Sequence, residues 1–465
     1  MLVAALRQRI LELAIQGKLV PQFPEDGSAE ELYQQIQQEK KKLIAAGKLK
    51  KEKPLPPISK EEIPFDIPKS WKWVRFSAVA DIARGGSPRP IKKYLTNASD
   101  GVNWIKIGDA DKGGKYIHTT KEKITREGVS RSREVHSGDF LLTNSMSFGR
   151  PYILNTDGCI HDGWLVFSNF HFAYDKDFLY YLLSSSFAYQ QFSQKASGSV
   201  VKNLNIDKVA NASFPLPPIH EQRRIAQKVE MLFAELDAIE QSQERVAAIQ
   251  TELNKRILER AIQGKLVPQR PEEGTAEDLY QQIQKEKKKL IAVGKLKKEK
   301  PLPPISEDEV PFDIPQSWKW CRIGEIFTLQ AGKFISADNI SEIESKGLFP
   351  CYGGNGCRGY VDNYNREGDF PLIGRQGALC GNIKRAKGKF YATEHAVVVD
   401  SYAKTNVDWA CAALTALNLN KYATATAQPG LAVSKIMEAL IPLPPLFEQQ
   451  RIVEKIERML AFCVE

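Results

Sequence analysis

The chain has 465 residues, of which 42% are hydrophobic and 26% charged, so it can build packed cores and is not a wholly disordered protein. A chain of this length suits about three domains of ordinary size. The formal net charge is +9, from 65 basic and 56 acidic residues, and this mild excess favours a polyanionic partner without identifying one.

The sequence shows no sign of membrane insertion or secretion. No stretch approaches the run of about 18 apolar residues that a membrane helix requires. The N-terminal segment alternates apolar and charged residues and lacks a small-residue cleavage site, which excludes a signal peptide. The seven cysteines form no CxxC pair, and an odd number fits reduced thiols better than a disulfide framework. We therefore expect a cytoplasmic protein without a membrane segment.

The chain contains two internal repeats, which decide its organisation. Residues 10–75 and 257–322 align without gaps at an offset of 247, and they differ at only 12 of 66 positions. A second repeat, at an offset of 227, pairs residues 214–234 with 441–461. The segments between the repeats have little evident similarity to one another. The order along the chain is therefore constant, variable, constant, variable, constant.

These repeats predict five segments that differ in charge. The segments are a constant helix and Lys/Pro-rich linker at 1–70, a first variable domain at 71–214, a central constant helix and linker at 215–317, a second variable domain at 318–441 and a C-terminal constant helix at 442–465. The first variable domain has 19 basic and 13 acidic residues, and the second has 14 and 11. Their balances of +6 and +3 account for the whole net charge. The positive excess thus belongs to the two segments that differ from one another.

The central constant segment has the hydrophobic spacing of a coiled coil. Its seam residues recur in alternating steps of four and three. They are Ile225, Val229, Leu232, Leu236, Ile239, Gln243, Val246, Gln250, Leu253 and Ile257. With Pro218 before the pattern and Gly264 after it, the spacing predicts a helix over 219–263, about 65–70 Å long. A long helix buried in one globular core is the alternative, which the glutamines in the seam and the charged flanks oppose.

The two chain ends supply a second copy of this helix pattern. Ile452, Ile456, Met459 and Cys463 correspond to its first half, and Val3, Leu6 and Ile10 correspond to its second half. We therefore predict an α/β protein in which two globular domains are separated by two long antiparallel coiled-coil helices. The arrangement is pseudo-twofold and circular, with the chain ends close together.

The constant linkers at 40–68 and 287–315 are first Lys-rich and then Pro-rich. The Lys run is most simply a solvated helix end, with contact to phosphate as the alternative. The Pro-rich part favours an extended conformation, so we expect a stiff linker that does not pack as a core.

Both variable domains have the sequence pattern of compact α/β domains. Each opens on Trp-Lys-Trp, at 71–73 and 318–320, and continues as short β-prone stretches separated by Gly, Asn and Asp turns. Each ends in a short helical stretch, DKDFLYYLLSSSFAYQQF in the first and VDWACAALTALNLNKYA in the second. This pattern predicts a twisted sheet with long polar loops in each domain. The first domain is 20 residues longer, 144 against 124.

Several loops of the variable domains combine basic residues with small polar ones, which suits contacts to DNA. Arg pairs with guanine, and Asn or Gln pairs with adenine, in the commonest contacts to base edges. The candidates in the first domain are Arg84, Ser87, Arg89, Lys92, Lys93, Asn144, Ser145, Ser147 and Arg150. Those in the second domain are Asn355, Arg358, Arg375, Gln376, Lys384, Arg385 and His395. An ordinary surface role is the alternative for each residue alone, whereas the set as a whole favours DNA binding.

Motifs for catalysis and cofactor binding are missing. The GGNG segment at 353–356 lacks the GxGxxG pattern, and no GxxxxGK[ST] segment occurs. There is no Asn-Pro-Pro-Tyr or Asp-Pro-Pro-Tyr segment, and no cysteines or histidines have the spacing of a zinc site. His118, His136 and His161 are not accompanied by a nucleophile motif. We therefore expect neither an active site nor a metal site in this chain.

The whole chain resembles the specificity (S) subunit of type I restriction-modification systems. The strongest signals are LPPIHEQRRI at 216–225 and LPPLFEQQRI at 443–452, each following a basic α/β segment. AIQGKLVPQ and GKLKKEKPLPPIS, both present twice, look like one branch of that family. The two variable domains look like its target-recognition domains.

This resemblance implies a DNA-binding subunit that has no catalytic activity of its own. Each recognition domain would recognise one half of a bipartite, asymmetric double-stranded DNA target from the major groove, and the helices would set the spacer. Two methyltransferase subunits that bind S-adenosylmethionine would methylate adenine, and ATP-driven restriction subunits would cleave unmodified DNA. S-adenosylmethionine, ATP and Mg are thus expected on the partner subunits, and no cofactor is expected on this chain.

The resemblance also suggests where the partner subunits assemble. Six residues fall at the starts of the constant helices, where subunits of this family meet: Glu221, Gln222, Arg223, Glu448, Gln449 and Arg451. Helix capping and pairing within the helix are the alternative roles for these residues.

Two other functions stay open from the sequence. A single-chain DNA methyltransferase or restriction enzyme would need cofactor and ATP motifs, which are missing. A non-specific architectural DNA-binding protein would bind all sequences equally at a fixed salt concentration. Two unlike recognition domains on like helices favour an asymmetric target, and a helix of about 65–70 Å is long enough to span one to two turns of DNA.

Overall fold

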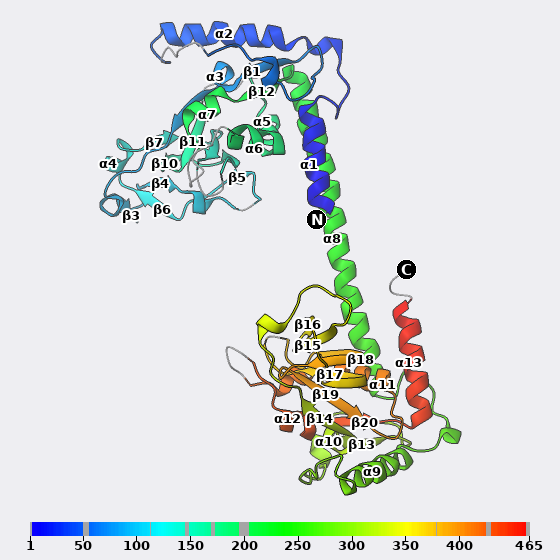
Figure 1. The fold of residues 1–465 in the computed structure, drawn as a ribbon. Coiled ribbons are helices and arrows are strands. Elements are labelled where there is room, and N and C mark those ends of the chain that lie inside the picture. Colours follow the sequence, from blue (N-terminus) through cyan, green and yellow to red (C-terminus); the bar gives the residue numbers. More distant parts are fainter. Residues whose placement is uncertain are drawn as a thin grey trace. The chain divides into compact units, whose positions relative to one another are not determined.

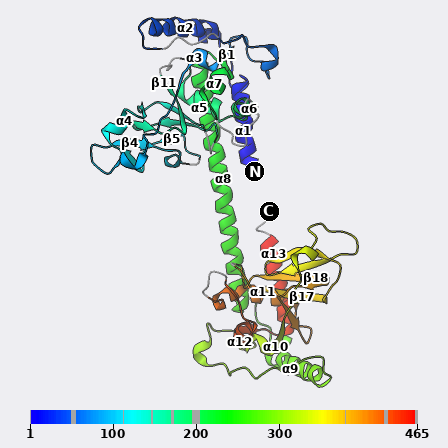
Figure 2. The same ribbon diagram turned by 60° about the vertical axis from the view of Figure 1, so that its left-hand side comes forward.

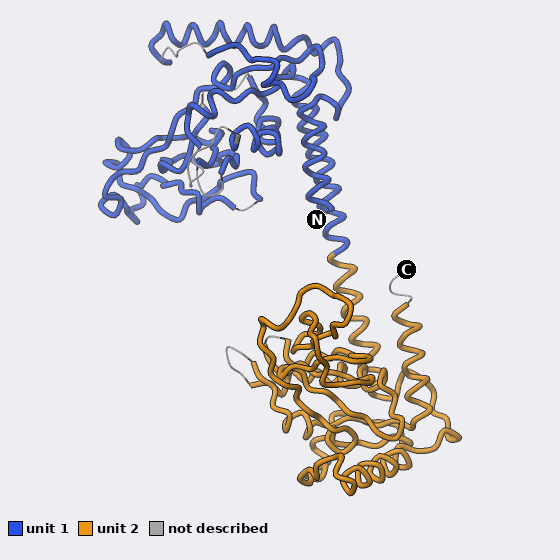
Figure 3. The backbone as a smooth tube through the Cα atoms, in the orientation of Figure 1, with its two compact units in different colours: residues 1–243 blue, residues 244–465 orange. Residues whose placement is uncertain are grey.

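The computed structural model of the chain describes residues 2–49, 55–111, 113–144, 148–168, 173–194, 204–377, 379–424 and 429–461. The chain forms two compact units, Met1–Gln243 and Glu244–Glu465, each with its own hydrophobic core (Figure 3). The boundary falls inside helix α8 (Ile219–Ile262), so each unit contains one half of this helix. Among the described helices, none combines the length and the apolar character needed to cross a membrane.

Unit 1 has a frame that the constant segments form. The frame comprises α1 (Leu2–Ile15), α2 (Ala29–Ala45), the strands β1 (Lys72–Arg75) and β12 (Ser213–Leu216), and the first half of α8. Helix α1 runs antiparallel along α8 (Figures 1 and 2), since Arg7 pairs with Asp237 whereas Gln22, beyond the end of α1, reaches Glu221. This confirms the expected antiparallel helix pairing within unit 1.

The recognition domain of unit 1 contains two five-stranded sheets. One has the order β3 (Leu95–Thr96), β6 (Glu122–Ile124), β4 (Val102–Ile105), β10 (Gly158–Ile160), β7 (Arg133–Val135). The other has the order β2 (Asp81–Arg84), β11 (Trp164–Ser168), β8 (Phe140–Thr143), β9 (Pro151–Leu154), β5 (Tyr116–Ile117). The helices are α3 (Phe76–Val79), α4 (Arg126–Val129), α5 (Lys176–Ser184), α6 (Ser186–Gln194) and α7 (Ile206–Asn211). Single 3₁₀ turns occur at Pro24–Asp26, Lys60–Glu62, Ile91–Lys93 and Ile107–Asp109.

Unit 2 repeats the frame and carries one larger sheet. Its frame comprises the second half of α8, α9 (Ala276–Ala292), β13 (Lys319–Arg322), β20 (Leu440–Leu443) and α13 (Leu446–Ala461). The six-stranded sheet has the order β14 (Phe327–Ala331), β19 (Ala396–Ser401), β17 (Arg366–Gly374), β18 (Ile383–Ala392), β15 (Phe349–Gly353), β16 (Gly356–Val361). The remaining helices are α10 (Ile323–Ile326), α11 (Val407–Ala416) and α12 (Val433–Glu438). The 3₁₀ turns are Pro271–Glu273, Glu307–Glu309, Ala337–Asn339 and Leu419–Tyr422.

The two recognition domains share one sheet topology although their sequences differ. The order β2-β11-β8-β9-β5 in unit 1 matches β14-β19-β17-β18-β15 in unit 2. In both sheets the first three pairings are antiparallel and the last one is parallel. The domains differ mainly in the length of the segment that joins the first strand of this order to the third. This segment has 55 residues in unit 1, at 85–139, and 34 residues in unit 2, at 332–365. Unit 1 uses its longer segment for most of a second sheet, so the expectation of one sheet per domain is wrong there.

The predicted coiled-coil seam of α8 is buried at Ile225, Val229, Leu236 and Ile257 and mostly exposed between the last two of these. Ile225 and Val229 lie in the core of unit 1, and Ile257 lies in that of unit 2 together with Ile452 of α13. In the middle of the helix the seam residues are exposed, and Val246 is 54% exposed. The heptad pattern therefore predicts the helix, observed at 219–262, but not the extent to which a second helix covers it. Cys463 lies outside the described residues.

The linkers pack more closely than their composition suggests. The buried guanidinium of Arg75 donates to the carbonyl oxygens of Pro56 and Pro57, at 3.4 Å each, and Arg322 does the same to two prolines of the second linker. Lys287, within the second Lys run, is 8% exposed and donates to the Gly324 carbonyl at 2.8 Å. The proline carbonyls thus satisfy buried donors. Lys287 is an exception to the expected solvated Lys run.

Candidate nucleic-acid interface

In each unit, hydrogen bonds among residues of the constant motifs link the frame to the variable domain. We call each set of bonded residues, around Glu221 and around Glu448, a joint. Glu221, at the start of α8, is buried and accepts hydrogen bonds from Trp71 Nε1 at 2.9 Å and Gln22 Nε2 at 3.0 Å. Burial raises the pKa of the Glu221 carboxyl, although both hydrogen bonds favour its ionised form. In unit 2 the equivalent carboxyl of Glu448 accepts from Trp318 and Gln269. Three residues that are distant in sequence are therefore held together in each unit.

A second pair of residues fastens the helix that follows each sheet. Gln222 Oε1 accepts from the backbone amide of Asp175, the N-cap of α5, at 2.7 Å. Likewise, Gln449 Oε1 accepts from the backbone amide of Asn406, the N-cap of α11, at 2.9 Å. Both glutamines are completely buried. They fix the recognition domain relative to the start of the frame helix in their own unit.

The Glu-Gln motifs are bonded within their own units. The side chains of Glu221, Gln222, Glu448 and Gln449 are at most 1% exposed. Their hydrogen bonds fix the helix starts, and a role of these helix starts in subunit assembly stays a prediction. Arg223, whose side chain is 58% exposed, keeps a position from which a partner is accessible.

Arg451, in the second motif, corresponds to Arg224 of the first motif, whereas Arg223 is the residue predicted from the sequence. Arg451 forms an ion pair with Glu273 at 2.6 Å, and in unit 1 it is Arg224 that pairs with Asp26. The 227-residue offset of the repeat, applied to Arg451, leads to Arg224 and not to Arg223. Sequence reasoning missed Arg224, although the repeat itself contained the information.

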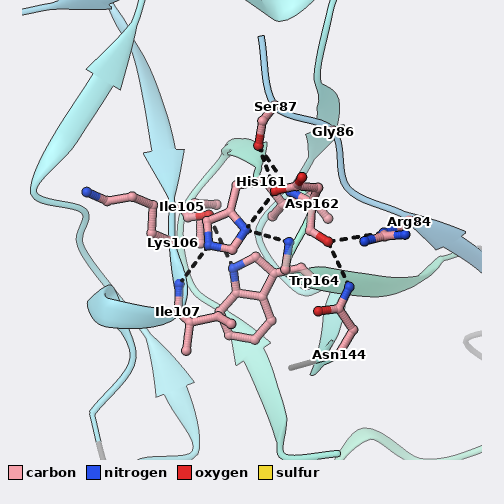
Figure 4. Close-up of polar contacts among 12 residues, drawn as sticks. Arg84, Gly86, Ser87, Ile105, Lys106, Ile107, Asn144, His161, Asp162 and Trp164 are labelled. Atoms are coloured by element: carbon pink, nitrogen blue, oxygen red, sulfur yellow. Dashed lines mark hydrogen bonds and ion pairs between the residues drawn. The ribbon is translucent and has the colours of Figure 1, made fainter. Parts of the chain in front are cut away.

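In unit 1, four predicted DNA-contact residues gather around one residue that was not predicted, Asp162. Figure 4 shows three of them, Arg84, Ser87 and Asn144. Arg84 Nε, at the end of β2, and Asn144 Nδ2, after β8, donate to the Asp162 backbone carbonyl at 3.1 and 2.7 Å. The hydroxyl of Ser87 donates to Asp162 Oδ1 at 2.9 Å. Arg89 pairs with Oδ2 at 3.2 Å and its side chain is 80% exposed. We call Arg84, Ser87, Arg89, Asn144 and Asp162 the Asp162 cluster.

The Asp162 cluster is electrostatically suited to present cations to a polyanion. Burial opposes ionisation of Asp162, but hydrogen bonds from Ser87 and Arg89 and the nearby His161 outweigh it, so the pKa of Asp162 is lowered. Burial lowers the pKa of His161, against the attraction of Asp162. The carboxylate is thus ionised at neutral pH and holds Arg89 at the surface.

The remaining candidates of unit 1 lie outside this cluster. Lys92 and Lys93 are exposed on the 3₁₀ turn that follows it. Arg150, just before β9, stacks its guanidinium over the Tyr152 ring at 5.6 Å. Ser145 and Ser147 lie outside the described residues. The lysines are suited to phosphate contact, whereas Arg150 already has an aromatic partner.

In unit 2, four predicted residues line one open hollow of about 580 Å³. They are Asn355, Arg358, Gln376 and His395, together with several glycines that leave room at the surface. Lys384 lies beside Gly356 at this hollow, with its side-chain carbons 3.7 Å from the position that a Cβ of this glycine would take. The hollow combines amide, guanidinium and imidazole groups, which are the groups that contact base edges.

Part of the hydrogen-bonding capacity near this hollow is unused. Arg375 Nε, Glu394 Oε2 and His395 Nδ1 are buried atoms without a hydrogen-bond partner among the described residues. His395 Nε2 lies 3.1 Å from Glu394 Oε1. Buried polar atoms are normally satisfied, so these three atoms are open to a bond from a water molecule, an ion or a ligand.

Arg385, also a candidate of unit 2, does not line this hollow and is paired with two acids of its own unit. Its guanidinium forms two hydrogen bonds with Asp369, at 2.7 and 2.6 Å, and also pairs with Asp408 in the first turn of α11. In unit 1 the corresponding acid of α5, Asp177, pairs with Lys115 at 2.5 Å. In both units a cation from the recognition domain therefore fastens the sheet to the helix that follows it.

Comparison with known proteins identifies the family. The family model described as "Type I restriction modification DNA specificity domain" matches residues 68–248 and 315–465. The chain belongs to the type I restriction-modification specificity family. Two similar relatives from Escherichia coli are the EcoprrI specificity subunit, 30% identical over 81% of this chain and 84% of that protein, and the EcoAI specificity subunit, 27% identical over 99% and 89%.

A solved structure supports the fold of this specificity subunit. A chain from a study of complex assembly and conformational transition of the type I R-M system covers 86% of this chain, and 93% of that chain is covered, with a TM-score of 0.59 at 21% identity. The resemblance predicted from the repeated motifs is thus confirmed. The sites on the specificity subunit are not given by these comparisons and rest on the geometry described above.

Proposed function

We propose that this specificity subunit recognises a bipartite, asymmetric sequence in double-stranded DNA, one half through each recognition domain and from the major groove. The observation that supports this most strongly is that two different recognition surfaces are mounted on the same joint. The Asp162 cluster and the hollow of unit 2 differ in their side chains, whereas the Glu221 and Glu448 joints are equivalent. Unlike surfaces on like frames favour a target with two unlike halves.

The frame helices would set the spacer between the two halves. Helix α8 has 44 residues, which corresponds to about 66 Å at 1.5 Å per residue. Half-sites on one face of DNA lie about 34–36 Å apart for each helical turn. A helix of this length is therefore suited to a spacer of one to two turns.

The chemistry would be performed by partner subunits. We expect two methyltransferase subunits that bind S-adenosylmethionine and methylate adenine, and restriction subunits that use ATP and Mg, all acting on DNA in the cytoplasm. No cofactor is assigned to the specificity subunit, and we propose that it is not itself an enzyme. Its contribution is sequence recognition and assembly, for which Arg223 on the outside of α8 and the exposed middle of that helix remain accessible.

A methylation and binding assay tests this proposal. The purified specificity subunit is incubated with host DNA and labelled S-adenosylmethionine, with and without the methyltransferase subunits of the same system. We expect adenine methylation only in the complex. Methylation by the specificity subunit alone would show an enzyme, and equal affinity of the complex for all duplexes at a fixed salt concentration would show an architectural protein.

A further inference from the structure

The two candidate surfaces lie at one equivalent place in the shared sheet topology. Gly85, after β2, donates its backbone amide to the Trp164 carbonyl at 2.9 Å, and Gly332, after β14, donates to that of Ala396 at 3.0 Å. A Cβ on either glycine would lie 2.1 Å from a backbone oxygen, so both positions require glycine. In both units the loop that begins there is thus bonded to the first residue of the second strand in the common order, β11 or β19.

Two further backbone contacts give the register of this equivalence. The amide of Asn144 donates to the Gly163 carbonyl, and that of Arg375 donates to the His395 carbonyl, at 3.0 Å each. The carbonyls of Asn144 and Arg375 in turn accept from a leucine amide, at 2.8 and 2.9 Å. Asn144 therefore corresponds to Arg375, and Gly163 to His395. The register is the same although the two sequences are unrelated in this region.

This register places an acidic residue at the same position in both domains. Asp162 directly precedes Gly163, and Glu394 directly precedes His395. Each acid contacts predicted DNA-contact residues: Asp162 is bonded to Ser87 and Arg89, and Glu394 Oε1 lies 3.1 Å from His395 Nε2. In unit 2 the second carboxylate oxygen, Glu394 Oε2, is left without a partner among the described residues.

We propose that Asp162 and Glu394 are the specificity-determining positioning residues of the two recognition domains. The inference rests on the proposed function and deepens it, because it names the residue that sets base preference in each half. A guanidinium or imidazole held by a carboxylate presents its donors in one orientation and therefore matches one pattern of base-edge acceptors.

The test uses the specificity subunit assembled with its methyltransferase subunits. The target is first mapped from methylated adenines in the host genome. Duplexes in which each base pair of that target is changed singly then compete for binding at a fixed salt concentration. We expect D162N to reduce discrimination about tenfold at base pairs of one half only, and E394Q to do so in the other half only. The conservative variant D162E should regain part of the discrimination.

Two further variants separate positioning from folding. R89Q changes a side chain that is 80% exposed, so it leaves the fold intact and should relax the same base pairs as D162N. D157N and E344Q are the controls, because each removes an exposed carboxylate that also accepts a hydrogen bond, from Ser137 and from Tyr360. Both controls should leave base preference unchanged.

The outcomes distinguish this inference from the proposed function. If the unmodified complex discriminates between sequences but D162N and E394Q weaken binding to all duplexes equally, with a lower melting temperature, the acids are merely structural and the inference is wrong. It is also wrong if either variant alters both halves. If the unmodified complex itself shows no sequence preference, the proposed function fails and the inference fails with it.

Discussion

At the scale of single residues, the buried carboxylates of Glu221 and Glu448 depend on both of their oxygens. Each accepts one hydrogen bond from a tryptophan indole and one from a glutamine amide. Replacement by glutamine puts an amide NH₂ in place of one acceptor, so that two donors face one another. An unsatisfied buried donor costs about 1–3 kcal/mol.

E221Q should therefore destabilise unit 1 by about 1–3 kcal/mol and leave unit 2 unchanged, and E448Q should do the reverse. Hydrogen exchange followed by mass spectrometry measures the two units separately. E235Q, at an exposed position of α8, serves as the control and should change neither unit. Equal protection of unit 1 in E221Q and the unmodified subunit would show that the joint contributes nothing.

The ion pair of Asp26 with Arg224 predicts a dependence on pH. The hydrogen bond from Arg224 lowers the pKa of Asp26 below its ordinary value, against the effect of burial. Because the pKa is depressed in the folded state, the stabilisation is complete above the unfolded pKa of about 3.9 and is lost as the pH falls through the folded value. Its size at neutral pH is about 1–3 kcal/mol, as for other hydrogen bonds to charged groups.

D26N should thus be less stable than the unmodified subunit at pH 7, and the difference should disappear in acid below the folded pKa. Unfolding of unit 1 in urea, monitored by hydrogen exchange at several pH values, measures this difference in stability. E25Q removes a neighbouring exposed carboxylate and should show a smaller effect. A difference between D26N and the unmodified subunit that is independent of pH would contradict the assignment to this ion pair.

Arg358 and Arg385 provide a matched comparison of two arginines in one domain. Arg358 lines the hollow of unit 2, whereas Arg385 is bonded to Asp369 and Asp408. R358Q should relax base discrimination in one half-site by about 1–3 kcal/mol without loss of stability. R385Q should lower the stability of unit 2 by about 1 kcal/mol and leave base preference unchanged. Competition binding measures base discrimination, and thermal unfolding measures stability. A loss of discrimination in R385Q together with a loss of stability in R358Q would contradict these roles.

At the scale of elements, the frame could be predicted from the sequence and the recognition sheets could not. Helix α8 was predicted at 219–263 and is observed at 219–262, because a heptad repeat and its flanking Pro and Gly are local signals. Strand order in the sheets depends on contacts between residues far apart, such as the pairing of β2 with β11. Short strands rich in Gly, Asn and Asp turns contain no signal for that order.

The same difference between local and distant signals explains which site residues could be predicted from the sequence. Arg84, Ser87, Arg89 and Asn144 were predicted from composition, and the structure brings them together around Asp162. Asp162 itself was missed because it lies 75 residues from Ser87 and its neighbours in sequence have no distinctive pattern. The ion pair of Arg385 was not predicted, because its partner Asp408 is likewise distant in sequence.

The length of α8 predicts the spacing of the DNA target. An insertion of one heptad after Gln243, where the helix surface is exposed, lengthens the helix by about 10 Å. We expect the preferred spacer to grow by about three base pairs, since a helical turn of DNA is about 34–36 Å. E244Q keeps the length and should keep the spacer. Mapping of methylated adenines measures the spacer, and an unchanged spacer after insertion would refute this role of the helix.

At the scale of the whole molecule, the positive charge and the sequence variation occupy the same segments. The two variable segments carry balances of +6 and +3, and the constant remainder is neutral. The constant residues build equivalent joints in the two units, and the variable residues build unlike surfaces on one shared sheet topology. The molecule thus combines a repeated frame with two different recognition domains.

The exchange of one recognition domain tests this account most directly. Residues 71–214 are replaced by the corresponding segment of a related specificity subunit, and the methylated sequence is mapped in cells that contain the matching methyltransferase subunits. We predict that one half of the target changes to that of the donor while the other half and the spacer stay the same. A change in both halves, or in neither, would contradict the claim that each unit recognises its own half of the DNA target.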